Sequence, residues 1–299
     1  MARTRLRGLE LGGVRMGIEV PESVEWQWPE GPLADFGCLP RDPEVHVGVR
    51  VAEISSEDFG GERYRVGART FEVAREDGGW LLGLMRRGKR ELLASFDLAF
   101  RAGEVVLSSE AARRPGVPLR SPLDEWIVVH RTFARGGLCL DASLEATGKG
   151  ARIRLGSSRG AAGMDGSEAT PSMGLFGGHG VIVREQAQQL RAYGTPWGES
   201  GERGWGSAAL GLCEIVIVEE SIQPFRERLD PVEAAELLVA HAVAPLCDDG
   251  LLDRVLRNAR ALGERAAIYR IGEPSAAAPA LEWRSAQLCN AFAPPSQWL

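Results

Sequence analysis

A glycine-rich stretch at residues 154–167, RLGSSRGAAGMDGS, follows a short apolar run that predicts a strand. Many proteins bind the phosphates of a nucleotide at such a turn, because backbone N–H groups can close around them. A working phosphate loop continues with Lys and then Ser or Thr, whereas no lysine follows Lys149 in this chain. The stretch therefore predicts a nucleotide site that uses another cation, the remnant of such a site, or a plain loop.

Three side chains in or near this loop could take part in its chemistry. Arg159 is either a substitute cation for an anionic ligand or a solvated loop residue. Asp141 interrupts an apolar strand, where a carboxylate needs a partner such as Arg152 or Arg154 on the neighbouring strand, and it could keep the site polar. His179 has no second ligand at a recognisable metal spacing, so no metal site is predicted.

A second candidate segment is GTPW at residues 194–197. It is either a rigid turn with Trp197 as a packing anchor, or part of a pocket in which Thr195 and Trp197 lie with Arg226 and Arg228. Hydrolysis by a Ser-His-Asp triad is not supported, because the chain has no G-x-S-x-G turn.

The composition is typical of a globular protein and argues against nucleic-acid-binding and membrane-spanning classes. The chain has 299 residues, of which 44% are hydrophobic, enough for a sizeable core and for about two domains. A net charge of −6 provides no basic stripe for nucleic acid, and no apolar run approaches the ~18 residues of a membrane span. Five widely spaced cysteines favour reduced thiols, and we expect a cytoplasmic protein.

The first part of the chain, residues 1–110, predicts an antiparallel β-rich domain. Valines alternate with polar residues in VHVGVRV at 45–51, the pattern of a half-buried strand. The segments RYRVGARTFEVARE, WLLGLMRRG and ELLASFDLAF continue as a meander through turns rich in Gly and Asp. Three prolines between 110 and 122 then predict a connector.

The second part, residues 111–272, predicts a mixed α/β domain, which makes the whole chain α/β (α+β). Asp230, Pro231 and Glu233 form a helix-start signal, and His130 and His241 fall on predicted helices, packed or exposed rather than catalytic. The expected helices cover 123–137, 229–243 and 249–266; the expected strands cover 138–146, 151–156, 180–185, 189–194, 212–221 and 267–272. Residues 273–299 read as an Ala/Pro-rich tail.

This order of elements resembles HPr kinase/phosphorylase-like proteins, which are relatives of the phosphoenolpyruvate carboxykinase fold. The resemblance covers roughly residues 5–272. Its most specific motif is GTPW, which precedes the apolar strand of LCEIVIVEES and then the segment RERLDPVEAAELL. The stretch GPLADFGCLPRDPEVHVGVRV at 31–51 is also similar to HPr-kinase-related proteins encoded beside peptide-tailoring genes.

The resemblance implies a degenerate kinase site. The family's phosphate loop falls on Gly156, Ser158, Arg159, Gly160 and Gly163. Ala162 then stands at the position of the lysine, and Gly163 at that of the Mg²⁺-binding hydroxyl. The family's strand histidine falls on Asp141, and its acidic pair falls on Gly178 and His179. Because phosphoryl transfer depends on positioning and charge neutralisation, these departures predict a catalytically inactive pseudokinase.

We therefore expect a protein without a cofactor that binds a protein or peptide, or acts as a scaffold in an assembly. The resemblance implies a homologous active kinase or a peptide natural-product precursor as partner, and a homo-oligomer. The alternative is an atypical ATP-dependent kinase or nucleotide-binding protein, loaded with Mg-nucleotide, in which Arg159, Arg154 or Arg184 replaces the lysine. A third possibility is a structural component that uses the fold only as a shape.

Overall fold

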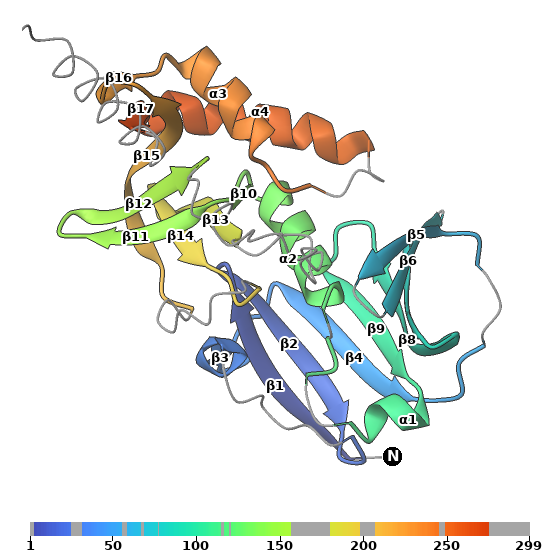
Figure 1. Ribbon diagram of the computed structural model, residues 1–299. Helices are drawn as coiled ribbons and strands as arrows, with labels where there is room; N and C mark the ends of the chain where they lie inside the picture. Colours follow the sequence, from blue (N-terminus) through green and yellow to red (C-terminus); the bar gives the residue numbers. More distant parts are fainter. Residues whose placement is uncertain are drawn as a thin grey trace, which may run out of the picture.

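The computed structural model describes residues 3–24, 32–55, 59–66, 69–76, 78–114, 117–119, 121–156, 180–197, 207–244 and 249–274. Within these residues the strands form a nine-stranded sheet and an eight-stranded sheet, and the helices lie between and beside them (Figure 1). The chain is thus a mixed α/β structure, as its sequence predicts. No helix in these ranges is long and apolar enough to cross a membrane.

The first sheet is built from residues 4–107. Its strands lie in the order β3 (Gly37–Cys38), β1 (Thr4–Leu11), β2 (Val14–Pro21), β4 (Val45–Val51), β9 (Ala102–Leu107), β8 (Lys89–Asp97), β7 (Gly79–Arg86), β6 (Arg69–Glu76) and β5 (Glu62–Val66), with a 3₁₀ turn at Pro32–Phe36. Most neighbours are antiparallel, but β4 runs parallel to both β2 and β9. The strand-rich first part is therefore confirmed, with two parallel pairs that an antiparallel meander does not contain.

The hairpin of β1 and β2 is an element that the sequence did not predict. Gly12 and Gly13 form its turn with φ angles of +57° and +74°, which L-residues with a side chain rarely adopt. A Cβ on Gly12 would also lie 2.1 Å from the side chain of Ile182 in the second sheet. The turn therefore requires glycine for its backbone and for its close contact with the other sheet.

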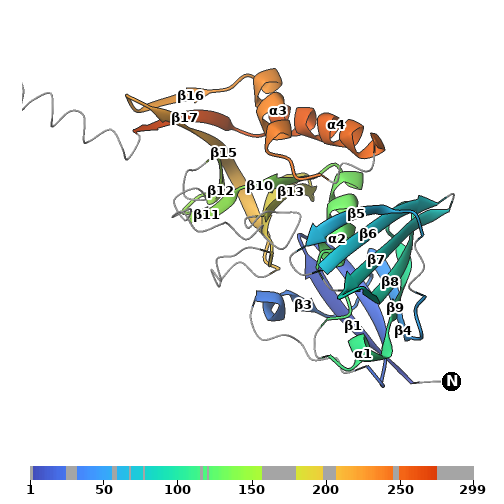
Figure 2. The same ribbon diagram turned by 45° about the vertical axis from the view of Figure 1, so that its right-hand side comes forward.

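Helix α2 (Leu123–Ala134) lies between the two sheets, and Figures 1 and 2 show it beside both. It contacts β2 of the first sheet and β10 of the second, and Trp126 packs against Phe71 with tilted rings whose centroids are 5.5 Å apart. Because it is covered on every side, almost all its residues are buried, including charged ones. The helix ends before Gly136, whose φ of +76° confirms the predicted C-terminal signal.

The second sheet contains two parallel pairs, β12–β15 and β15–β17. Its main path is β10 (Leu138–Asp141), β13 (Gly180–Gln186), β14 (Gln189–Gly194), β15 (Leu210–Ser221), β12 (Gly150–Leu155) and β11 (Ser143–Thr147), and β17 (Ile268–Pro274) pairs with β15 and β16 (Phe225–Arg228). The predicted strand 138–146 is in fact two strands, β10 and β11. They separate at Ala142 and occupy opposite ends of this path.

Helices α3 (Pro231–Ala240) and α4 (Asp249–Arg265) pack against each other beside the second sheet (Figure 2). Gly263 allows their close approach, because a Cβ there would lie 2.7 Å from the carbonyl oxygen of Pro231. Leu251, Val255 and Ala259 recur along the buried face of α4, as the helical period predicts. A short helix, α1 (Ser109–Ala112), follows the last strand of the first sheet.

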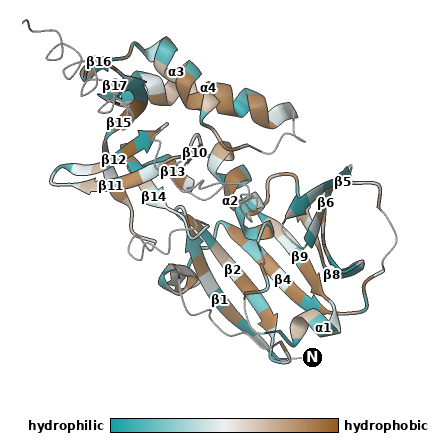
Figure 3. Ribbon diagram, in the orientation of Figure 1, coloured by the Kyte–Doolittle hydropathy of each residue, from teal (hydrophilic) through white to brown (hydrophobic). Residues whose placement is uncertain are grey.

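One hydrophobic core joins both sheets and the helices between them. It contains Leu9 and Met16 of the first sheet, Trp126 of α2, and Ile182 and Ile215 of the second sheet. Figure 3 shows hydrophobic and hydrophilic residues alternating along the strands, as expected for sheets with one buried face. The predicted division at residue 110 falls in α1, and most of the predicted tail, from residue 275, lies outside the described residues.

Candidate functional site

The predicted phosphate loop begins where β12 ends, at Gly156, and returns to the second sheet at Gly180, the first residue of β13. Five predicted site residues, Ser158, Arg159, Gly160, Gly163 and His179, lie outside the described residues. The two ends of the loop are described. We call the residues around them, Asp141, Gly156, Gly180, Thr195 and His241, the strand-end site.

Gly156 has the backbone that a tight turn after a strand requires. Its φ is +70°, and a Cβ there would lie 2.8 Å from the carbonyl oxygen of Val218 and 3.9 Å from Cε1 of His241. Any side chain would therefore press on the neighbouring strand β15 as well as strain the backbone. The sequence indicated this glycine correctly as the start of a turn.

Asp141 is the last residue of β10 and lies opposite Gly180. Its backbone N–H donates to the carbonyl oxygen of His241, 2.9 Å away. Because the imidazole of His241 lies near Gly156, the residue after α3 links Asp141 to Gly156. The expected partnership of Asp141 with Arg152 or Arg154 is wrong. Asp141 is exposed and makes no ion pair with a described residue, because its carboxylate is solvated and requires no protein partner.

The two arginines of β12 instead bind acidic residues on neighbouring strands. Arg152 donates to Glu214 of β15 over 2.5 Å. Arg154 donates to Glu273 of β17 over 2.7 Å and lies 3.4 Å from Glu145 of β11. These ion pairs neutralise the cations that precede the loop in the sequence.

Thr195 and Trp197 attach the GTPW segment to two other elements. Thr195 Oγ1 donates to the carbonyl oxygen of Gly180 over 2.8 Å, which places it at the strand-end site. Trp197 Nε1 donates to Asp124 Oδ2 of α2 over 2.9 Å. This geometry favours the interpretation of Trp197 as an anchor, since its indole N–H fixes the end of β14 to the central helix.

Asp124 is a buried carboxyl that the sequence reasoning did not single out. Burial raises its pKa to about 6, and the hydrogen bond from Trp197 lowers the pKa by a smaller amount. Its Oδ1 atom has no hydrogen-bond partner among the described residues. The sequence carried no signal for this, because an acidic residue in the first turn of a helix is ordinarily exposed and stabilises the helix dipole.

The sequence predicts a pocket in which Arg226 and Arg228 lie with Thr195 and Trp197. Both lie on β16, where Arg226 donates to Glu214 over 2.7 Å and its guanidinium carbon lies 3.9 Å from the ring centroid of Tyr269. Arg228 is exposed. Their described partners thus lie on the second sheet's β15 and β17, and the pocket with Thr195 and Trp197 stays a prediction.

Arg184, a possible substitute for the missing lysine, is directed toward the first sheet. Its guanidinium donates to the carbonyl oxygen of Gly13 over 3.0 Å and lies 3.4 Å from Glu44. Only 8% of its side chain is exposed. Arg184 therefore helps to connect the two sheets and is not available to a ligand at the loop.

The described part of the strand-end site offers a solvated carboxylate, a hydroxyl and an imidazole. The imidazole of His241 was not predicted, because it comes to the site from the end of α3 through the tertiary fold alone. No group of three or more His, Cys, Asp or Glu residues in the described ranges could hold a metal ion. Comparison with known protein-family models and with curated protein sequences gives no match.

Proposed function

We propose that this protein is a catalytically inactive, HPr kinase-like pseudokinase that binds a protein or peptide partner, or that acts as a scaffold in an assembly. The proposed partner is a second copy of this chain, a homologous active kinase or a peptide natural-product precursor. On this proposal the protein needs no cofactor and is cytoplasmic. The resemblance of residues 5–272 to HPr kinase-like proteins motivates this proposal.

The placement of Arg154 and Arg184 supports this proposal over the atypical kinase. A kinase without its loop lysine needs another cation to neutralise the transferred phosphoryl group. Arg154 is bound to Glu145 and Glu273, and Arg184 is buried against Glu44. Moving Arg154 to a nucleotide would break its pairs with Glu145 and Glu273, and moving Arg184 would take a buried cation away from Glu44, which costs free energy. Arg159 is the remaining candidate.

Thermal unfolding with nucleotides tests the inactive site. The melting temperature is measured with ATP, GTP and pyrophosphate, each with and without Mg²⁺, for the wild-type protein and for Arg159→Ala. We expect no stabilisation that depends on Arg159. A ligand at 100 times its Kd stabilises a protein by about 2.7 kcal/mol, so an occupied site would be evident. Stabilisation by Mg-ATP that Arg159→Ala abolishes would instead establish the atypical nucleotide-binding protein.

Sedimentation velocity over a wide concentration range tests the binding role. We expect an oligomer, or a complex with an active kinase homologue or a precursor peptide. A protein that remains monomeric at every concentration and binds neither candidate would contradict the scaffold proposal.

A further inference from the structure

A row of like charges crosses three adjacent strands of the first sheet. In the strand register Arg69 of β6 lies opposite Arg86 of β7, and Arg86 lies opposite Lys89 of β8. Residues that lie directly opposite share one face of a sheet, and like charges there repel each other. None of these three side chains has an ion pair with another described residue. The row therefore lacks its counter-charge within the described chain.

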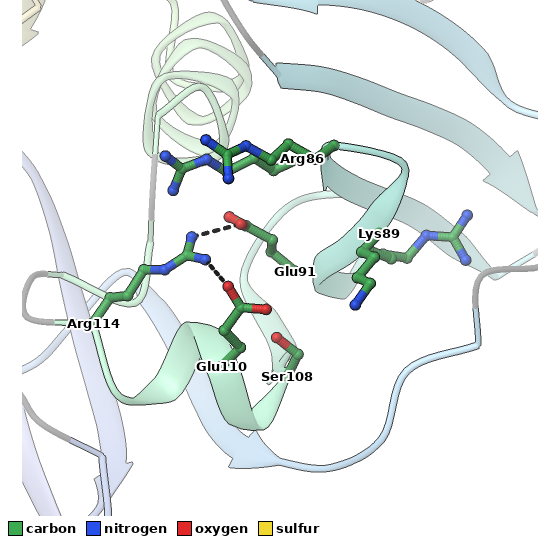
Figure 4. Close-up of a pocket in the computed structure, with 8 residues that line it drawn as sticks. Arg86, Lys89, Glu91, Ser108, Glu110 and Arg114 are labelled. Atoms are coloured by element: carbon green, nitrogen blue, oxygen red, sulfur yellow. Dashed lines mark hydrogen bonds and ion pairs between the residues drawn. The ribbon is translucent and has the colours of Figure 1, made fainter.

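A pocket of about 360 Å³ lies where this row meets α1 and the segment after it. Arg86, Arg87, Lys89, Arg90, Glu91, Ser108, Glu110 and Arg114 line it. Figure 4 shows Arg114 extending toward Glu91 and Glu110, with Arg86 on the far side of Glu91 and Lys89 on the hairpin. The pocket is therefore formed by the β7–β8 hairpin on one side and by α1 on the other.

The acidic side chains of the pocket already have partners. Arg114 donates to Glu91 over 2.5 Å and also to Glu110. Glu91 faces Arg114 because it is the extra residue of a bulge in β8, between Leu92 opposite Leu84 and Arg90 opposite Met85.

The neighbouring Arg90 has its partners away from Arg114. It pairs with the buried Glu72 over 2.7 Å and donates to the carbonyl oxygen of Ser55. The pocket lining thus holds five cations and two carboxylates, and the nearby Glu72 is shared between Arg90 and Arg63. Arg86, Arg87 and Lys89 carry charges that no ion pair with a described carboxylate neutralises.

We propose that this pocket binds the phosphate group of a small phosphate ester. Its excess of positive charge favours an anion such as a phosphate dianion, and arginine presents a planar fork of donors that suits phosphate oxygens. Its volume is that of a small-molecule site. The net charge of −6 for the whole chain disfavours a nucleic-acid backbone as ligand. This inference is independent of the strand-end site and of the function proposed above.

Calorimetric titration with glycerol 3-phosphate at low salt tests the proposal. The wild-type protein is compared with Lys89→Ala and Arg86→Ala, and with Arg7→Ala as a control that removes the same charge from an exposed position on β1. Loss of one charged hydrogen-bond donor is expected to weaken binding about tenfold in each pocket variant. The control should bind as the wild type does.

The melting temperature of the ligand-free protein supplies a second measurement. Arg86→Ala removes the central charge of the repelling row, so we expect it to raise the melting temperature by ~1 °C while it weakens phosphate binding. A residue that matters only for folding would lower both. The variant therefore separates a binding role from a structural one.

Four results would overturn the proposal: no binding of glycerol 3-phosphate, an equal loss in Arg7→Ala, equal affinity for malonate, or tighter binding of a DNA duplex. The outcome is distinct from that of the nucleotide experiment. Stabilisation by a phosphate compound that Lys89→Ala reduces and Arg159→Ala preserves belongs to this pocket. The opposite pattern belongs to the loop after Gly156.

Discussion

At the scale of single residues, His130 shows how strongly the core determines ionisation. The side chain lies among aromatic rings, with centroids 4.6 Å from Phe100 and 5.2 Å from Trp80, and neither ring nitrogen has a hydrogen-bond partner among the described residues. Burial, together with a smaller effect of the charge of Arg254, lowers its pKa from 6.5 to about 3. His130 is therefore neutral in the fold and takes up a proton mainly after unfolding.

The first prediction follows from this shift. The stability that neutral His130 contributes is complete above pH 6.5 and is lost as the pH falls toward 3, by about 1.4 kcal/mol per pH unit. His130→Leu lacks this dependence. Urea denaturation between pH 7.5 and 5 should show that the wild type loses stability relative to the variant as the pH falls below 6.5, with that slope. A constant difference would contradict the assigned pKa.

The pH dependence of stability that the Asp124 carboxyl contributes has the opposite sign to that of His130. Its pKa is raised from 3.8 to about 6, so its favourable contribution is complete below pH 3.8 and is lost as the pH rises through 6. Asn keeps an acceptor for Trp197 and cannot ionise. We expect the stability of Asp124→Asn relative to wild type to be about 2 to 3 kcal/mol greater at pH 7.5 than at pH 4.

The same denaturation experiment carries a control. Asp124→Ala removes the acceptor of the Trp197 hydrogen bond, and it should be less stable than Asp124→Asn at both pH values. If Asp124→Asn differs from wild type equally at pH 4 and pH 7.5, ionisation of the buried carboxyl is not the cause.

At the scale of elements, the N-terminal cap of α3 allows a prediction about the stability of this helix alone. Asp230 accepts from the backbone N–H groups of Val232 and Glu233, at 2.9 and 3.1 Å. Asp230→Ala leaves these donors without their acceptor, and we expect a loss of about 1 kcal/mol in the free energy of unfolding. Glu236→Ala, an exposed change within the same helix, should cost less than half as much. Equal effects would mean that the cap does not stabilise α3.

The elements that the sequence predicted are those with local signals. Helix α2 ends at a glycine, and α3 begins at an Asp-Pro pair, so both were identified within a few residues. Strands β10 and β11 were joined into one, because their separation at Ala142 depends on the pairing of β10 with β13, which is distant in the sequence, whereas β11 pairs with β12 directly after it. The β1–β2 hairpin was missed, although a glycine pair marks its turn.

In the candidate site too, the features with local signals were predicted, and those that depend on the tertiary fold were not. Gly156 was identified from its turn, which is a property of the backbone. The contact of Trp197 with Asp124 and the approach of His241 could not be predicted, because each joins segments that only the tertiary fold brings together. The expected partner of Asp141 was wrong for the same reason: the side chains of β12 face acids on three other strands.

At the scale of the whole molecule, Glu44 connects the two sheets. It precedes β4 of the first sheet and forms ion pairs with three arginines that follow or lie within α2 and the second sheet. Arg131 of α2 and Arg135, which follows the helix, lie 3.7 and 3.2 Å from its carboxylate, and Arg184 of β13 lies 3.4 Å away. Arg131 and Arg184 are buried. One carboxylate therefore offsets charges on elements that the shared core holds together.

Glu44→Gln should weaken this connection without changing the shape of the side chain. The buried arginines would lose their counter-charge, and we expect a loss of about 3 kcal/mol in the free energy of unfolding. Because one hydrophobic core includes both sheets, the loss should shift a single cooperative transition in urea, followed by tryptophan fluorescence and by circular dichroism. Glu104→Gln, which breaks the exposed pair with Arg50, should cost less than about 1 kcal/mol. Separate transitions for the two probes would show instead that the sheets unfold independently, and that Glu44 stabilises only their contact.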